Sequence, residues 1–169
     1  MRGVRVTDSL SLLAGFVFAH AAWSVSDLSE GELLAPLAIL EKSGQREIFR
    51  FEAETQEQAI FEGKVMLSTR ERDVDAWAFA REGQMQERER YVDVLSVEAK
   101  TSDMLESIVF VQRFQPFSKG KFLLLGDPLV SIGGKAVSEI EEKQLINQLR
   151  IGIQSHSQAA EQWNEWVSE

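Results

Sequence analysis

A glutamate and a lysine separated by one residue come closest to a catalytic pattern in this chain. Glu98 and Lys100 lie in the segment Val97-Glu98-Ala99-Lys100. On a β-strand, alternation would put both side chains on the same face. In one large class of metal-dependent nucleases, a strand carries such a carboxylate to hold Mg²⁺ and such a lysine to help activate water. The spacing therefore indicates metal-assisted hydrolysis, provided that a second carboxylate lies nearby.

Asp75 is the second carboxylate that this hypothesis requires. If residues 82–89 form a symmetric loop between two strands, Asp75 lies opposite Glu98 and Asp73 lies opposite Lys100. A shift of one residue in this register would move one set of side chains to the other face. The hydrolase hypothesis thus assigns catalysis to Asp75, Glu98 and Lys100.

The alternative interpretation of the same residues is a solvated surface. A three-residue pattern recurs by chance, and a surface ion pair between Asp73 and Lys100 would account for the lysine without catalysis. We adopt this interpretation and predict no catalytic residue, no metal and no cofactor. The hydrolase that uses Asp75, Glu98 and Lys100 is the alternative.

Two tryptophans near the end of the chain suggest a different kind of site. Trp163 and Trp166 follow Ala159 and Ala160 at helical spacing. Tryptophan is enriched among the residues that anchor protein interfaces, but a helical stripe of apolar residues also packs in its own core. Both interpretations stay open. The first predicts a protein partner or self-association through Trp163 and Trp166.

The elements that must position these residues are predicted as a four-stranded antiparallel meander over residues 74–126. Links of only a few residues favour antiparallel neighbours, because parallel strands need a long crossover. The predicted strands are 74–81, 90–100, 107–117 and 121–126. Residues 90–100 carry apolar side chains on both faces and should form a central strand. A further strand near 46–52 brings the sheet to about five strands.

Three helices are predicted to cover this sheet, near residues 8–24, 56–69 and 138–168. The second and third begin with capping-box patterns at Thr55 and Ser138. Gly63 lies in the second helix and is predicted to approach the backbone of the strand that carries three alternating alanines, at positions 76, 78 and 80. The resulting fold class is α+β, in one domain over residues 1–169.

The amino-acid composition indicates which classes of partner and which cellular compartment fit this chain. The net charge of −9 disfavours nucleic acid, because affinity for phosphates comes mostly from basic side chains. No apolar run is long enough for a membrane span. The absence of cysteine fits the cytoplasm. The alternative is a secreted or periplasmic protein, because residues 1–21 have the outline of a signal peptide. We predict a small non-catalytic binding or assembly domain, whose ligand the sequence does not identify.

Overall fold

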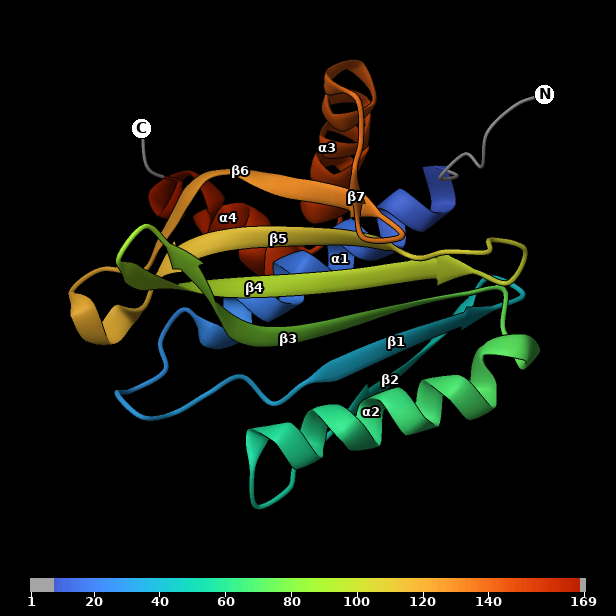
Figure 1. The fold of residues 1–169 in the computed structure, drawn as a ribbon, viewed down its shortest axis with the longest axis horizontal. Helices are drawn as coiled ribbons and strands as arrows, with labels where there is room; N and C mark the ends of the chain where they lie inside the picture. Colours follow the sequence, from blue (N-terminus) through green and yellow to red (C-terminus); the bar gives the residue numbers. More distant parts are fainter. Residues whose placement is uncertain (1–7, 168–169) are drawn as a thin grey trace.

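The computed structural model of the protein describes residues 8–167. Seven strands form one sheet in the order β2-β1-β3-β4-β5-β6-β7, and every neighbouring pair is antiparallel (Figure 1). The predicted α+β class and the meander are confirmed, although the sheet has more than about five strands. The strands are β1 (Leu37–Lys42), β2 (Gln45–Arg50), β3 (Ala76–Glu87), β4 (Arg90–Thr101), β5 (Ile108–Gln115), β6 (Leu123–Ile132) and β7 (Lys135–Ala136).

Within residues 8–167, four α-helices cover the two faces of the sheet. They are α1 (Asp8–Val25), α2 (Gln56–Arg70), α3 (Glu139–Gln154) and α4 (Ser157–Trp166), and the short 3-10 turns Glu71–Asp73 and Phe117–Lys119 follow α2 and β5. In Figure 1, α1, α3 and α4 lie on one side of the sheet and α2 lies along its β1–β2 end. The predicted C-terminal helix is divided at Ser155 and His156, which cap the end of α3 and the start of α4.

Strand β4 is central, as predicted. It pairs with β3 on one side and with β5 on the other. Leu95, Val97 and Ala99 are buried in the same core as α1, while Val94 is buried on the opposite face. Apolar residues on both faces are therefore the reason for the interior position.

Helix α1 supplies the centre of the main core. Leu10, Leu13, Ala14 and Val17 are each 0% exposed and pack with residues of β3–β6 and of α3. The sequence of α1 is apolar on nearly every side, which fits this position between the sheet and α3. Cleavage of residues 1–21 as a signal peptide would remove most of this helix from the core.

Two glycines allow α1 and α3 to cross at close range. A Cβ atom on Gly15 would lie 2.7 Å from the Cα of Gly152, and one on Gly152 would lie 2.5 Å from the carbonyl oxygen of Leu12. These distances are to backbone atoms, so neither contact could be relieved by a side-chain rotation.

The predicted environment of Gly63 was wrong. The alanines at 76, 78 and 80 face the α1 core, because a strand sends alternate side chains to opposite faces. Trp77 and Phe79 therefore point toward α2. A Cβ atom on Gly63 would lie 2.5 Å from Cε1 of the Phe79 ring. The glycine makes room for an aromatic side chain rather than for a neighbouring backbone.

None of the helices in the described range 8–167 is long and apolar enough to cross a membrane.

Candidate functional site

The structure places Asp75 away from Glu98, whereas Glu98 and Lys100 lie on the same face of β4. Phe79 lies opposite Glu98 and Trp77 lies opposite Lys100. Asp75 precedes β3, where its Oδ2 accepts a hydrogen bond of 2.8 Å from the backbone N–H of Ser43. The predicted pairing of Asp75 with Glu98 and of Asp73 with Lys100 was wrong.

The reason is the length of the β3–β4 hairpin. The strands continue to the pair Glu87–Arg90, so the turn is formed by Arg88 and Glu89 instead of by all of residues 82–89. Arg88 has a φ of 55°, which closes this tight connection. Moving the turn toward β4 displaces every cross-strand partner of Glu98 and Lys100.

Each member of the Glu98–Lys100 pair has a local partner. Oε2 of Glu98 accepts a 2.6 Å hydrogen bond from the Ser107 hydroxyl. Nζ of Lys100 lies 4.0 Å from Oε1 of Glu71. In the described range 8–167, no three His, Asp or Glu side chains converge to hold a metal ion.

The two C-terminal tryptophans are in part core residues. Trp166 is 5% exposed and makes an edge contact with Phe122, with ring centroids 5.2 Å apart. Trp163 is half-buried and makes an edge contact with Phe18 at 5.6 Å. Trp166 is therefore not available on the surface as an anchor, whereas Trp163 lines a cavity.

This cavity, here called the Gln112 cavity, lies between α3, α4 and strand β6. Its volume is about 240 Å³. The sequence did not predict it, because its walls come from segments far apart in the chain. Most of the wall is apolar and is made by Phe18, Leu124, Ile146, Leu149, Ile153 and Trp163.

Gln112 is the buried polar residue of this cavity, and its side chain is held by an irregularity in the sheet. Val111 pairs with Leu129 and Arg113 pairs with Leu125, so residues 126–128 bulge opposite Gln112. The last predicted strand, 121–126, in fact continues through this bulge to Ile132. Pro128, which lacks a backbone donor, is accommodated there.

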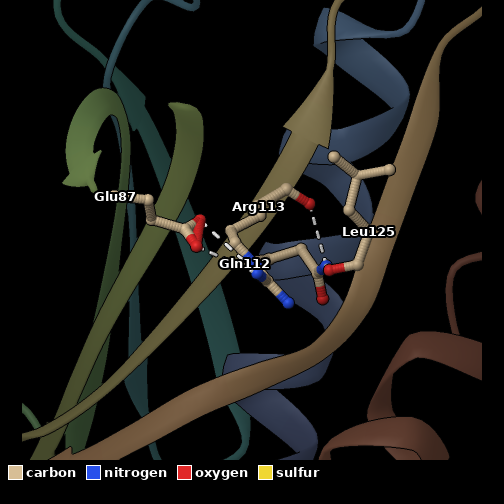
Figure 2. Close-up of polar contacts among 4 residues, drawn as sticks. All are labelled: Glu87, Gln112, Arg113 and Leu125. Carbon is tan, nitrogen blue, oxygen red and sulfur yellow. Dashed lines mark hydrogen bonds and ion pairs between the residues drawn. The ribbon is translucent and has the colours of Figure 1, made fainter. Parts of the chain in front are cut away.

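The Gln112 amide satisfies carbonyl groups that the bulge removes from the regular ladder. Its Nε2 donates to the carbonyl oxygens of Arg113 (2.9 Å), Gly126 (3.1 Å) and Leu125 (3.2 Å). Figure 2 shows the amide turned toward Leu125. These contacts fix the orientation of the amide, because an inverted amide would oppose oxygen to oxygen.

The amide oxygen of Gln112 is left without a donor. Gln112 is 3% exposed, yet no described residue donates a hydrogen bond to Oε1. Among residues 8–167, only the Ser11 hydroxyl is a side-chain polar atom that is both fully buried and without a partner. Oε1 of Gln112 has no partner and is not in that class, so part of its surface is accessible. Oε1 is therefore an open acceptor in the wall of the cavity.

The Arg113 side chain lies beside the bulge on the opposite face of the sheet. Its Nη1 donates to Oε2 and Oε1 of Glu87 at 3.2 and 3.4 Å (Figure 2). Its Nη2 lies 2.9 Å from where a Cβ atom on Gly126 would be. Gly126 has a φ of 71°, a conformation that glycine adopts without strain. Gln112 thus holds the bulge by hydrogen bonds from one face, and the Arg113 side chain leaves no room for a side chain at Gly126 on the other.

One ion pair lies at the rim of the cavity. Nη2 of Arg150 on α3 lies 2.8 Å from Oδ1 of Asp127 in the bulge. These are the only two charged residues among those that line the cavity in the described chain. Their side chains are 56% and 68% exposed, so the pair adds little stability.

A histidine pair connects α1 to the start of α4, the helix that carries Trp163. The backbone N–H of Ala159 donates to Nδ1 of His156 at 3.1 Å. A neutral His156 then carries its proton on Nε2, which lies 3.0 Å from Nδ1 of His20 and can donate to it. Burial lowers the pKa of both histidines, and for His20 the nearby charges of His156 and Arg50 lower the pKa further.

Gln112 is the site residue that sequence reasoning missed. The available signal was a single polar residue on the strand face that it shares with Ile108, Phe110 and Phe114. No family model, no curated protein and no solved structure matches this chain. Its function therefore has to be inferred from the geometry of the described residues.

Proposed function

We propose that this protein is a non-catalytic binding domain that holds a small, mainly apolar ligand in the Gln112 cavity. The observation that carries the proposal is the open acceptor Oε1 of a 3%-exposed glutamine in an apolar wall. Ligand sites typically combine apolar walls with a few placed polar groups.

Burial makes this acceptor significant. A polar group that is removed from water without a hydrogen bond costs on the order of 1–3 kcal/mol. A ligand that fills the cavity and displaces water from Oε1 avoids this cost only if it donates a hydrogen bond to that oxygen. The volume of about 240 Å³ is sufficient, because an engineered apolar cavity of about 150 Å³ in another protein binds benzene.

The test is a titration with toluene, an apolar probe smaller than the cavity, followed by methyl NMR. We expect the methyl signals of Leu124, Ile146 and Ile153 to shift, because these side chains line the cavity. The signals of Val109 and Leu129 should stay unchanged, because alternation places them on the opposite face of the sheet from Phe110 and Val130.

A pair of variants localises the binding. Ile146→Phe places additional carbon atoms in the cavity and should abolish the shifts. Ile151→Phe is the matched control, because Ile151 lies on the same helix and is 56% exposed. Shifts that persist unchanged in Ile146→Phe would place the toluene elsewhere and contradict the proposal.

Self-association is a second candidate property, and a specific surface favours it. Phe61 and Val65 lie one turn apart on α2 and are 66% and 47% exposed. Self-association was predicted through Trp163 and Trp166, but Trp166 is buried within the chain, and so are most apolar side chains of α1. The outer side of α2 is the surface that a second copy would cover.

Sedimentation at increasing concentration tests this second property. We expect wild-type protein to associate and Phe61→Glu to reduce the association, because a charge in an apolar contact is costly. Ile140→Glu is the control, since Ile140 is also exposed, at 74%, but lies on α3. Monomeric wild-type protein at the highest concentration would contradict self-association.

The compartment proposed for this domain is the cytoplasm. The absence of cysteine supports it. The packing of α1 in the core supports it as well, because cleavage after residue 21 would remove side chains that fill the core.

A further inference from the structure

We infer that the ligand of the Gln112 cavity is an uncharged aromatic molecule that carries one O–H or N–H donor, directed at Oε1 of Gln112. This inference rests on the proposed function and specifies the chemistry of the same site. Three features of the cavity lead to it: the fixed amide, the paired charges and the aromatic wall.

The fixed amide makes Gln112 an acceptor only toward the cavity. Nε2 of Gln112 already donates to the carbonyls of Arg113, Leu125 and Gly126. Rotation of the amide by half a turn would present a donor to the cavity but would lose all of these hydrogen bonds. The ligand group that contacts Oε1 must therefore be a donor, because an acceptor at that position would meet the lone pairs of Oε1.

The paired charges favour an uncharged ligand. Asp127 and Arg150 are the charged members of the cavity lining among the described residues, and they neutralise one another at 2.8 Å. A charged ligand would have to break this pair or enter an apolar space without a counter-charge. Both routes are costly, because an unpaired charge loses its hydration on burial.

The aromatic wall favours a ring. Phe18 and Trp163 meet edge to face, with an interplanar angle of 80°, and both line the cavity. A further ring can make the offset or edge contacts that aromatic groups prefer. The cavity volume of about 240 Å³ corresponds to a ligand on the order of ten non-hydrogen atoms, by comparison with the smaller benzene-binding cavity.

Indole and benzofuran form a matched pair of probes for this inference. They have the same two-ring shape, but indole has an N–H donor where benzofuran has an oxygen. We expect calorimetric titration to give a dissociation constant below about 1 mM for indole, which is modest for a ligand of this size. Benzofuran should bind about tenfold more weakly, the effect of one buried hydrogen bond.

Two variants test whether indole binds in the Gln112 cavity. Indole binding should be lost in Ile146→Phe and kept in Ile151→Phe. The resonances of the Gln112 side-chain amide should shift with indole. These readouts do not require a substitution of Gln112 itself, which supports the bulge.

The outcomes separate the ligand class from the proposed function. Equal binding of indole and benzofuran, both blocked by Ile146→Phe, would overturn the donor requirement while the cavity remained a binding site. Tighter binding of benzofuran would overturn it in the same way. If toluene, indole and benzofuran all fail to bind, the proposed function is overturned as well. The proposed function is also overturned if these probes bind equally to the wild-type protein and to Ile146→Phe.

Discussion

Gly15 of α1 and Gly152 of α3 face one another at a helix crossing that leaves no room for a side chain on either residue. The atoms in the way belong to the backbone of the opposite helix. Because neither glycine has a Cβ atom, the backbones of α1 and α3 can lie in direct contact. This contact places α3 against α1, the helix at the centre of the core.

Gly152→Ala should therefore destabilise the protein. Alanine normally improves a helix by up to about 1 kcal/mol relative to glycine. Here the added methyl group forces the backbones apart, and we expect a net loss of about 1–3 kcal/mol, as for other overpacked cores. The free energy of unfolding from chemical denaturation measures this loss.

Gly63→Ala is the matched control for this change. Gly63 is also a buried helical glycine, but its neighbour is the outer end of the Phe79 ring, which can move. The loss should be smaller than for Gly152→Ala. If the two losses are equal, or if Gly152→Ala is stabilising, the close crossing is not a constraint.

Gln112→Leu tests the support of the β6 bulge. Leucine has a similar volume but removes the donor from three carbonyl oxygens. We expect a loss of about 1–3 kcal/mol in the free energy of unfolding, because these groups lose their donor in a partly buried position.

Gln115→Leu provides the comparison on the same strand. Nε2 of Gln115 also donates to a carbonyl oxygen, that of Lys121 at 2.7 Å, but this contact is exposed to water. The carbonyl can bind water in the variant, so the cost should be smaller. A smaller loss for Gln112→Leu than for Gln115→Leu would refute the supporting role of Gln112.

The histidine pair should make stability depend on pH near neutrality. Burial lowers the pKa of His20 and His156 in the folded protein from the ordinary value of 6.5. Below about pH 6.5, the unfolded chain therefore binds protons more readily than the folded protein, and stability falls as the pH falls. Above this range both histidines are neutral in either state, and their full contribution is present.

The double variant His20→Gln/His156→Asn should flatten this dependence between pH 7 and about pH 5. Asparagine can still cap the start of α4 but does not titrate. Burial raises the pKa of Glu82, which acts in the opposite direction, but Glu82 is present in both proteins. Parallel curves of unfolding free energy against pH would show that the pair makes no contribution.

Glu98 and Lys100 should not bind a metal ion. Their partners are Ser107 and Glu71, and Asp75 is engaged with the backbone of Ser43. We expect no micromolar binding in calorimetric titrations with Mg²⁺ and Mn²⁺. Binding that disappears in Glu98→Ala, together with nuclease activity that the same variant loses, would support the hydrolase alternative.

The course of β4 was predictable because local composition determines it. Val94, Leu95, Val97 and Ala99 require burial on both faces, which only a central strand provides. The partners of Glu98 were not predictable, because they depend on where the hairpin turns. At the exposed end of the β3–β4 hairpin, the two strands and the turn all contain polar residues. The composition of this end therefore does not show where the strands stop and the turn begins.

The Gln112 cavity could not be predicted from the sequence either, because it also depends on the register between two strands. A glutamine among apolar residues is visible at position 112, but its hydrogen-bond partners lie in a bulge of the next strand. That bulge is centred on Asp127 and Pro128, which resemble the end of a strand. Only the register of β5 against β6 shows that the strand continues.

The position of α1 has a consequence for the order of events during synthesis. This helix is made before every element that it packs against, and its contact with α3 has to wait for all strands of the sheet. Closure of such a long segment opposes rapid folding. Until α3 has been synthesised, the apolar side chains of α1 are not fully buried. The growing chain therefore passes through a stage in which it is prone to aggregate. Protection by a chaperone would matter most in that interval.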